Sequence, residues 1–411
     1  MGYLANLLNA ATGRVPEVQA NAASLEAQIS AALGGGATQS GANVTVDSAL
    51  KNTTVFRCVS LISYTIGMLP LHLHAANDQR EKAKEHPLYD ILMVQPNEYQ
   101  TAFDFRALMQ MRALSQGNAY ALPIRSMGRV IGLQPVPTEN MEPKLKDDWT
   151  VEYRYQTPKG NTVVLKAEDV FHLRGLSKDG INGLSLVKQA AEAIGLAMQT
   201  EKAAARLFRN GMLVGGALKH PGKLSAEAFE RLKKSMEARE GADQAHKWMI
   251  LEEGLEADPF AQTGKDSQHL ETRQHQIEEI GRVFGVPRPL LMVDDTSWGS
   301  GIDVLGQFFV RYGLAPWFTA WEQAIRRTLL TGDEKANYYA KFNDGALLRG
   351  SMKDQAEFFA KALGSGGHQP FMSVDEVRAL MDYGKAAEGS LPAAPGRERN
   401  GGDEPAQTAR N

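Results

Sequence analysis

The sequence predicts an α+β fold, in which helices and antiparallel strands occupy separate stretches of the chain. Three observations support this class. Apolar residues recur with helical spacing over residues 53–67. Short alternating segments separated by turn signals fill residues 118–175. A small strand–turn–strand insertion at 242–266 separates two amphipathic helices at 223–241 and 267–286.

The first folded block begins near Val46 with a helix that ends near Gly67, and an alternating strand follows it. A short helix and a Pro-Asn break come next. The helix after that break has Thr101 as its N-cap and Gly117 at its end. The apolar face of the first helix is formed by Val55, Val59, Ile62 and Ile66.

The second half of the chain predicts longer helices. Ser185 can cap a long amphipathic helix, and Gly211 can end it. A later apolar helix contains Pro316, which removes a backbone hydrogen bond and should bend the helix. We expect the ends of the chain, residues 1–45 and 385–411, to be flexible because they are rich in glycine or poor in large apolar residues.

Composition excludes several classes of protein. The 411 residues include 45 basic and 48 acidic side chains, a balance that argues against an overall basic nucleic-acid-binding surface. The single cysteine, Cys58, lies in an apolar run and is expected to be a buried structural thiol. No apolar stretch is long enough to span a bilayer, so we expect no membrane segment.

No catalytic constellation is apparent. Gly216 and Gly222 do not have the spacing of a nucleotide-binding loop, and no hydroxyl residue follows Lys223. His269 and His275 are six residues apart, so they do not share a helical face for a metal ion. We therefore expect a protein that is not an enzyme and has no cofactor, no metal and no catalytic residues.

Several short motifs of this sequence, taken in their order along the chain, make it resemble the portal proteins of tailed bacteriophages, in the family typical of long-tailed phages. TTVFRCVSLISYTIGMLPLHLH is similar to the opening helix and strand of that family, and LSQGNAY and VFHLRGLSKDGINGLS resemble two later segments. The chain departs from the family pattern at Val214, where proline is usual, at Arg288, between two prolines, and at Asp375, where asparagine is usual.

The resemblance implies a portal-like fold with a wing, a two-helix stem, a small β clip and a helical crown, assembled as a ring of twelve subunits. The predicted division is a flexible N-terminal segment at 1–45, wing at 46–222 and 303–340, stem helices at 223–241 and 267–286, clip at 242–266, channel loop at 287–302, crown at 341–384 and a disordered tail at 385–411.

The resemblance also implies a function and partners. The ring would form the channel at one capsid vertex through which genomic DNA is packaged and ejected. Partners would be further copies of the chain as a dodecamer, the terminase large subunit, the major capsid protein or scaffold, and a head–tail connector. Double-stranded DNA would pass without sequence specificity. The protein would reside in the virion, and in the host cytoplasm during assembly.

Two groups of residues are expected to carry this function. The predicted channel-loop tip consists of Asp294, Asp295, Thr296, Ser297 and Trp298. Its carboxylates would repel phosphates and let DNA slide; alternatively, they pair with basic side chains at a subunit interface. The acidic clip carries six acidic and two basic residues over 241–266, and its predicted motor-docking residues are Trp248, Glu252, Glu253 and Asp258. Trp248 could instead pack inside the clip.

Two other functions remain open at this point. One is a phage or mobile-element enzyme that processes DNA, such as a nuclease, which would need clustered acids or a nucleotide loop. The other is a structural scaffold without a channel. Thermal stability with and without magnesium and nucleotide distinguishes such an enzyme from a portal protein. Negative-stain imaging distinguishes a scaffold without a channel from a ring.

Overall fold

The computed structural model describes residues 36–77, 80–210, 216–219, 226–237, 256–259, 265–293, 301–345, 352–367 and 369–381. The chain divides into two compact units, Met1–Leu347 and Leu348–Asn411. The predicted flexible tail at 385–411 and residues 1–35 of the predicted flexible N-terminal segment lie outside the described residues.

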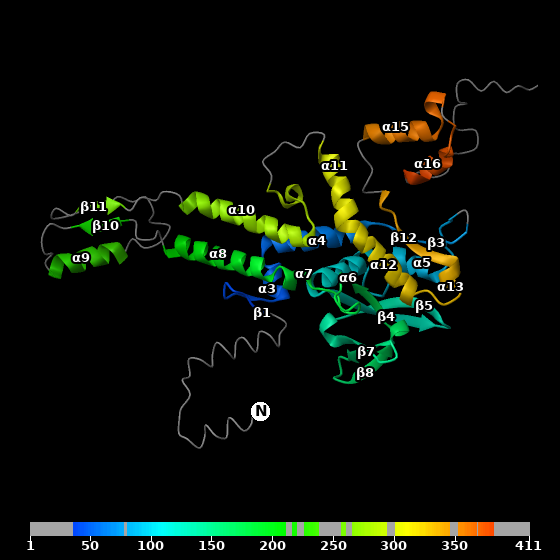
Figure 1. The fold of residues 1–411 in the computed structure, drawn as a ribbon, viewed down its shortest axis with the longest axis horizontal. Coiled ribbons are helices and arrows are strands. Elements are labelled where there is room, and N and C mark those ends of the chain that lie inside the picture. Colours follow the sequence, from blue (N-terminus) through cyan, green and yellow to red (C-terminus); the bar gives the residue numbers. More distant parts are fainter. Residues whose placement is uncertain are drawn as a thin grey trace, which may run out of the picture. The chain divides into compact units, whose positions relative to one another are not determined.

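Two capped helices form the centre of the first unit (Figure 1). Asn52 caps α4 (Thr53–Met68) by accepting hydrogen bonds from two backbone N–H groups of its first turn. Thr101 caps α6 (Ala102–Gln116) in a reciprocal capping box, as predicted. Shorter helices flank this pair: α3 (Val46–Leu50) and α5 (Pro87–Met93).

The end of α6 requires glycine. Gly117 adopts a φ of 88°, and a Cβ there would lie 2.2 Å from the carbonyl oxygen of Gly183. The loop that contains Gly183 therefore packs directly against the end of α6. The predicted glycine terminator is therefore confirmed, and its role includes a tertiary contact.

The strands form small antiparallel sheets. One has the order β5-β4-β9, a second β6-β7-β8, and in a third β3 pairs with β12 from the far end of the unit, with Leu71 opposite Phe342. The strand-rich prediction for 118–175 is confirmed. The bounds are β3 (Leu71–Ala75), β4 (Asn118–Ser126), β5 (Arg129–Val136), β6 (Met141–Leu145), β7 (Val151–Gln156), β8 (Thr162–Lys166), β9 (Phe171–Arg174) and β12 (Tyr338–Phe342). Short helical turns separate some of them: η1 (Thr138–Asn140), η2 (Ala167–Asp169) and α13 (Glu334–Asn337).

The helix predicted to start after Ser185 is divided in two. Ser185 caps α7 (Leu186–Gln189), and the backbone leaves helical geometry at Ala190 before α8 (Ala191–Asn210) begins. Further along the chain lie β10 (Gly216–Lys219), α9 (Ala226–Glu237), β11 (Glu256–Pro259) and α10 (Lys265–Phe284).

The long apolar helix contains a π-helical turn where a bend was predicted. α11 (Gly301–Phe308) leads into η5 (Phe309–Leu314), and α12 (Ala315–Thr328) follows. The Ala315 N–H donates to the Val310 carbonyl, five residues back. This widened turn comes directly before Pro316, whose ring would clash with a carbonyl in a regular α-helix interior.

The core of the first unit joins residues from both ends of the chain. Cys58 is fully buried within it, and burial raises the pKa of its thiol to about 12, as expected for a structural cysteine. Trp321 of α12 packs edge-on against Phe105 of α6. Ile280 of α10, in the range predicted as the second stem helix, is also buried in this core.

Residues 36–45 correct the prediction of a flexible segment over 1–45. Here β1 (Gly36–Ala37) pairs with β2 (Asn43–Val44), and the Thr38 hydroxyl donates to the Ala42 carbonyl. The hairpin packs so closely on α8 that a Cβ on Gly195 would lie 2.6 Å from the Thr38 hydroxyl oxygen. The buried Ala42 and Val44 provide the apolar contact that the glycine-rich composition concealed.

The second unit contains two helices, α15 (Met352–Ala362) and α16 (Val374–Leu380), with the turn η6 (Ser365–Gly367) between them. The N–H of Phe371 donates to the Ala362 carbonyl, and its ring packs edge-on against Phe358. Ser373 and Glu376 exchange hydrogen bonds at the start of α16. This helix pair falls within the range predicted as the crown.

Candidate functional site

The predicted channel loop at 287–302 is described at its two ends. Its predicted tip, Asp294, Asp295, Thr296, Ser297 and Trp298, lies outside the described residues. The first end continues from α10 into the short helix η4 (Arg288–Leu291). Met292 then adopts a left-handed φ of 59°, and its side chain is largely exposed.

Side chains of two helices hold this first end. The Arg57 Nε of α4 donates to the Leu290 carbonyl at 3.1 Å. Arg288 pairs with Glu278 of α10, with 3.3 Å between Nε and Oε1. Arg288, which departs from the family pattern, therefore contributes an ion pair to the base of the loop.

The second end of the loop begins at Gly301 and continues through α11 into the π turn. Gly313 of that turn lies against Gly285, which ends α10 with a φ of 70°. A Cβ on Gly313 would lie 3.2 Å from the Gly285 carbonyl oxygen and 3.0 Å from the Phe309 ring. The helices that carry the two ends of the loop therefore meet backbone to backbone.

The helix beyond the π turn is fixed to the rest of the first unit. Trp321 Nε1 donates to the buried Gln110 Oε1 of α6 at 2.9 Å. Near the end of α12, Arg327 donates to the His172 carbonyl at 2.7 Å, and Arg125 of β4 donates to the Thr328 carbonyl at 2.7 Å. α12 is thus anchored on both α6 and the β5-β4-β9 sheet.

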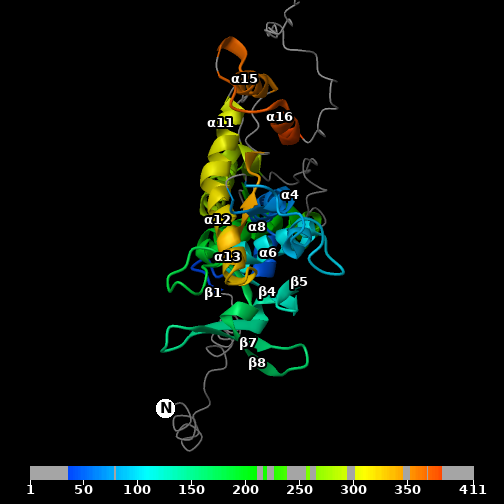
Figure 2. The same cartoon turned by 90° about the vertical axis from the view of Figure 1, so that its right-hand side faces the viewer.

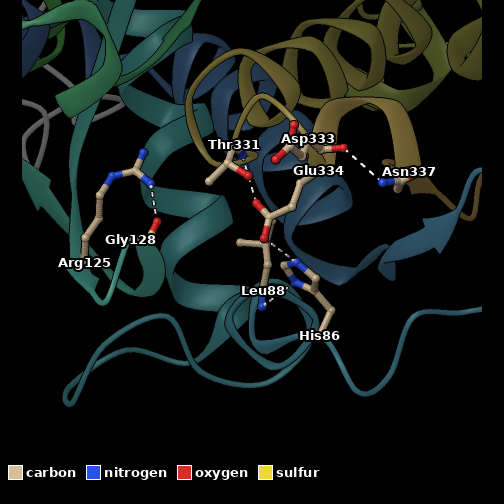
Figure 3. Close-up of polar contacts among 8 residues, drawn as sticks. All are labelled: His86, Leu88, Arg125, Gly128, Thr331, Asp333, Glu334 and Asn337. Carbon is tan, nitrogen blue, oxygen red and sulfur yellow. Dashed lines mark hydrogen bonds and ion pairs between the residues drawn. The ribbon is translucent and has the colours of Figure 1, made fainter.

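Hydrogen bonds to the Glu334 carboxylate hold the segment after α12 in place (Figure 3). His86 Nε2 donates to Glu334 Oε1 at 3.1 Å, while His86 Nδ1 accepts from the Leu88 N–H and caps α5. The Thr331 N–H donates to the other Glu334 oxygen at 2.9 Å. Burial raises the pKa of Glu334, but the hydrogen bonds from Thr331 and His86 outweigh it and lower the pKa overall.

A buried histidine network joins two of the motifs that carried the resemblance. His172 Nε2 lies 2.9 Å from Asn118 Oδ1, and its Nδ1 lies 3.1 Å from the Tyr153 hydroxyl. Asn118 Oδ1 also accepts from the Gly183 N–H at 2.8 Å. Burial, with Arg327 and Arg174 nearby, lowers the pKa of His172 to about 3, so this histidine is neutral at pH 7.

This network was missed by the reasoning on isolated motifs. Asn118 belongs to the GNAY motif and His172 to the FHLR motif, which are far apart in the sequence. Their residue types alone did not indicate a contact. The arrangement is structural. Through a neutral imidazole, these hydrogen bonds join β4, β7, β9 and the loop at Gly183.

The predicted clip residues are described only in part. Trp248, Glu252 and Glu253 lie outside the described residues. Asp258 lies on β11, which pairs with β10, so that Asp258 is opposite Ala217. β10 falls in the range predicted as wing, whereas β11 falls in the range predicted as clip.

α10 packs against α8 as well as against α4. Gln276 Nε2 donates to Thr200 Oγ1 at 3.0 Å, and Arg273 lies 3.8 Å from Glu201. Figure 1 shows the two helices side by side. The prediction that 223–241 and 267–286 form the stem stays a prediction, and the described contacts join α10 to α8.

Within the described ranges, no cluster of three or more His, Cys, Asp or Glu side chains has the arrangement of a metal site. In the same part of the chain, no helix has the length and apolar character needed to cross a membrane.

The chain is similar to known portal proteins in sequence. The sequence model of the phage portal protein family matches residues 53–382. The portal protein of Enterobacteria phage HK97 is 35% identical over 337 residues, which cover 80% of this chain and 78% of that protein. The probable portal protein of Streptomyces phage phiC31 is 31% identical over 374 residues, which cover 86% of this chain and 79% of that one.

Solved structures share the fold. The neck of an empty gene transfer agent (GTA) particle, computed with C6 symmetry, matches with a TM-score of 0.61 and 23% identity, covering 88% of this chain and 99% of that chain. The neck of the native GTA particle, computed with C12 symmetry, matches with a TM-score of 0.59 and 21% identity over the same shares. The motifs, the fold and the match over residues 53–382 agree, and the chain belongs to the phage portal protein family.

Proposed function

We propose that the chain is the subunit of a ring that forms the DNA channel at one capsid vertex. The family match over residues 53–382 is the observation that carries this proposal, because it includes most of the first unit and all of the described second unit. The GTA neck structures computed with C6 and C12 symmetry support a cyclic assembly. Genomic DNA would be packaged and ejected through this ring, which is a structural part of the virion.

The loop geometry supports the channel role. Both ends of 287–302 are attached to helices that are themselves anchored in the core, through Arg57 at one end and the Gly285–Gly313 contact at the other. A loop with two fixed ends can present its tip at a constant height in every copy of a ring. Asp294 and Asp295, repeated around that ring, would repel the phosphate backbone and keep the duplex sliding.

We assign the stem to α8 and α10, in place of the sequence-based pairing of 223–241 with 267–286. The two helices are joined by the contacts of Gln276 and Arg273. The pairing of β10 with β11 brings residues 216–219 and 256–259 together. The clip would then include α9 and both strands, and would extend beyond the predicted 242–266.

The acidic part of this clip is proposed to dock the terminase large subunit, and later the head–tail connector. Aromatic anchors dominate binding energy at many interfaces, and surrounding charges steer association. Trp248 would supply the anchor and Glu252, Glu253 and Asp258 the charges. The outer parts of the wing would contact the major capsid protein or scaffold during assembly in the host cytoplasm.

Packaging in vitro tests this function. Procapsids assembled with and without the chain are supplied with terminase, ATP and linear DNA, and the DNA protected from added nuclease is measured. We expect protection only when the chain is present. Protection without the chain would contradict the proposal. DNA cleavage by the purified chain in magnesium would favour the alternative of a DNA-processing enzyme.

A further inference from the structure

Among the exposed large apolar side chains of the first unit, two groups form strips along helices. The first, which we name the α4 strip, consists of Phe56, Tyr64 and Met68 of α4 with Phe103 of α6. These side chains are between 38% and 64% exposed. The three α4 residues are spaced by multiples of four and so follow one side of the helix. Tyr64 stacks on Phe103 with 5.9 Å between ring centroids.

The second strip, which we name the α11 strip, consists of Val304, Phe308 and Tyr312. It follows α11 into the π turn, again with a spacing of four, and its side chains are between 52% and 66% exposed. The rings of Phe308 and Tyr312 are 5.5 Å apart. Each strip is therefore an aromatic pair extended along a helix, and contiguous exposed apolar patches of this kind mark interaction sites.

The helices that bear the strips both pack on α6. Arg106 of α6 donates to the Gly67 carbonyl of α4 at 2.7 Å. One turn further along the same helix, Gln110 accepts from Trp321 of α12, which continues α11. Figure 2 shows α11 and α12 at one edge of this unit and α4 towards the other.

This placement distinguishes two kinds of assembly. A two-fold dimer joins one patch to the same patch of its partner and leaves the second strip uncovered. A head-to-tail contact joins two different patches, covers both strips in every copy, and closes into a ring when the rotation between neighbours divides a full turn. Two separate apolar strips, carried by different helices of one unit, are what the second arrangement needs.

We propose that the α4 strip of one subunit packs against the α11 strip of the next subunit around the ring. This inference rests on the proposed ring and adds the surfaces that hold it together. Tyr64, Phe103, Phe308 and Tyr312 form the centre of the contact, because aromatic side chains are enriched in the buried parts of interfaces. The contact lies beside the Gly285–Gly313 junction, so that assembly and the loop are supported by the same helices.

Complementation between two variants tests the head-to-tail geometry. Tyr64→Glu disables the α4 strip and Phe308→Glu disables the α11 strip, and each should prevent ring formation by itself. An equimolar mixture retains one intact strip of each kind, and should yield heterodimers but no rings. Val164→Glu is the matched control, since Val164 is 59% exposed on β8 and outside both strips; its rings should form normally. Native mass spectrometry counts the subunits.

Cross-linking provides a second test that does not depend on a buried charge. Cys58 is the only cysteine of the sequence and is buried, so introduced cysteines are the sole accessible thiols. With a bismaleimide, the double variant Met68→Cys and Val304→Cys should give a ladder of covalent oligomers. Each single variant should stay largely uncrosslinked, while a mixture of the two single variants should give dimers.

The outcomes separate this inference from the proposed function. Wild-type rings together with normal rings of Tyr64→Glu and Phe308→Glu would overturn the strip contact and leave the ring intact. Efficient cross-linking of either single variant with itself would also overturn it, because it would show a two-fold contact. A wild-type chain that stays monomeric would overturn the ring and the strip contact together.

Discussion

Gly285 and Gly313 form a backbone contact in which a Cβ on Gly313 would lie 3.2 Å from the Gly285 carbonyl oxygen. One glycine ends α10 and the other lies in the π turn, so the contact joins the helices on both sides of the predicted channel loop. The helices that precede and follow the loop therefore meet at this junction, with α11 between the junction and the second end of the loop. A change at this junction should displace both helices at once.

Substituting Gly313→Ala tests the junction. The added methyl group would meet the Phe309 ring at 3.0 Å as well as the Gly285 carbonyl, so we expect a loss of about 1–3 kcal/mol of unfolding free energy from overpacking. Gly306→Ala is the matched control. A Cβ there would have no neighbour within 4 Å, and the variant should gain about 0.5–1 kcal/mol because alanine favours helix. Urea denaturation measures both; equal effects would contradict a tight junction.

The buried His172 predicts a pH dependence. Its pKa is lowered in the folded protein to about 3 from an ordinary value of 6.5, so between these values the unfolded chain binds a proton that the folded chain does not. The stability contributed by the neutral histidine is present above pH 6.5 and is lost as the pH falls towards about 3. The slope should approach ~1.4 kcal/mol per pH unit.

Urea denaturation of the wild type and His172→Gln at pH 7, 6 and 5 measures this slope. The variant cannot gain a proton at this position, so its stability should decline less steeply than that of the wild type. The comparison removes the contribution of carboxylates, which both proteins share. Parallel declines would show that His172 is not held neutral.

The predictions from sequence succeeded where local chemistry decides the structure. Thr101 and Gly117 marked the ends of α6 because capping side chains and a left-handed glycine are local requirements. Pro316 marked the irregular helix for the same reason, although the chain resolves the clash with a π turn. These features depend on a few neighbouring residues and can be read without knowing the rest of the fold.

The predictions were less complete where a distant segment decides what covers a surface. Ile280 lies in the helix predicted at 267–286, and its burial in the core of the first unit depends on segments far away in the sequence. The hairpin at 36–45 gained burial by packing near Gly195, which its own composition did not indicate. Periodicity identifies the apolar side of an element, but the partner that covers it is set by tertiary contacts.

Charge reversal in the loop tests the proposed sliding mechanism. Changing Asp294 and Asp295 together to Lys should leave ring assembly intact and slow DNA translocation, because lysines attract the phosphates that the carboxylates repel. The effect should be largest at low salt, where screening is weak. Optical-tweezers packaging measures the velocity, and the Asn pair should give an intermediate effect. Failed ring assembly would favour an interface role, and unchanged velocity would exclude the loop from translocation.

Charge reversal in the clip tests motor docking. Glu252→Lys with Glu253→Lys should weaken binding of the terminase large subunit by roughly tenfold or more, since close charge pairs across an interface each couple by 1.5 kcal/mol or above. Ring assembly should be unaffected. The same charge change in the wing, Glu81→Lys with Glu98→Lys at two exposed positions, provides the control. Equal affinity of all three rings in a pull-down titration would contradict docking at the clip.

The proposed function and the strip contact both require a ring, and electron microscopy of the purified full chain tests for it most directly. End-on views should show closed rings with rotational symmetry and an open central channel wide enough for a DNA duplex. Side views should place the α8–α10 pairs around that channel. A population of monomers, two-fold dimers or open filaments at micromolar concentration would contradict the central claim.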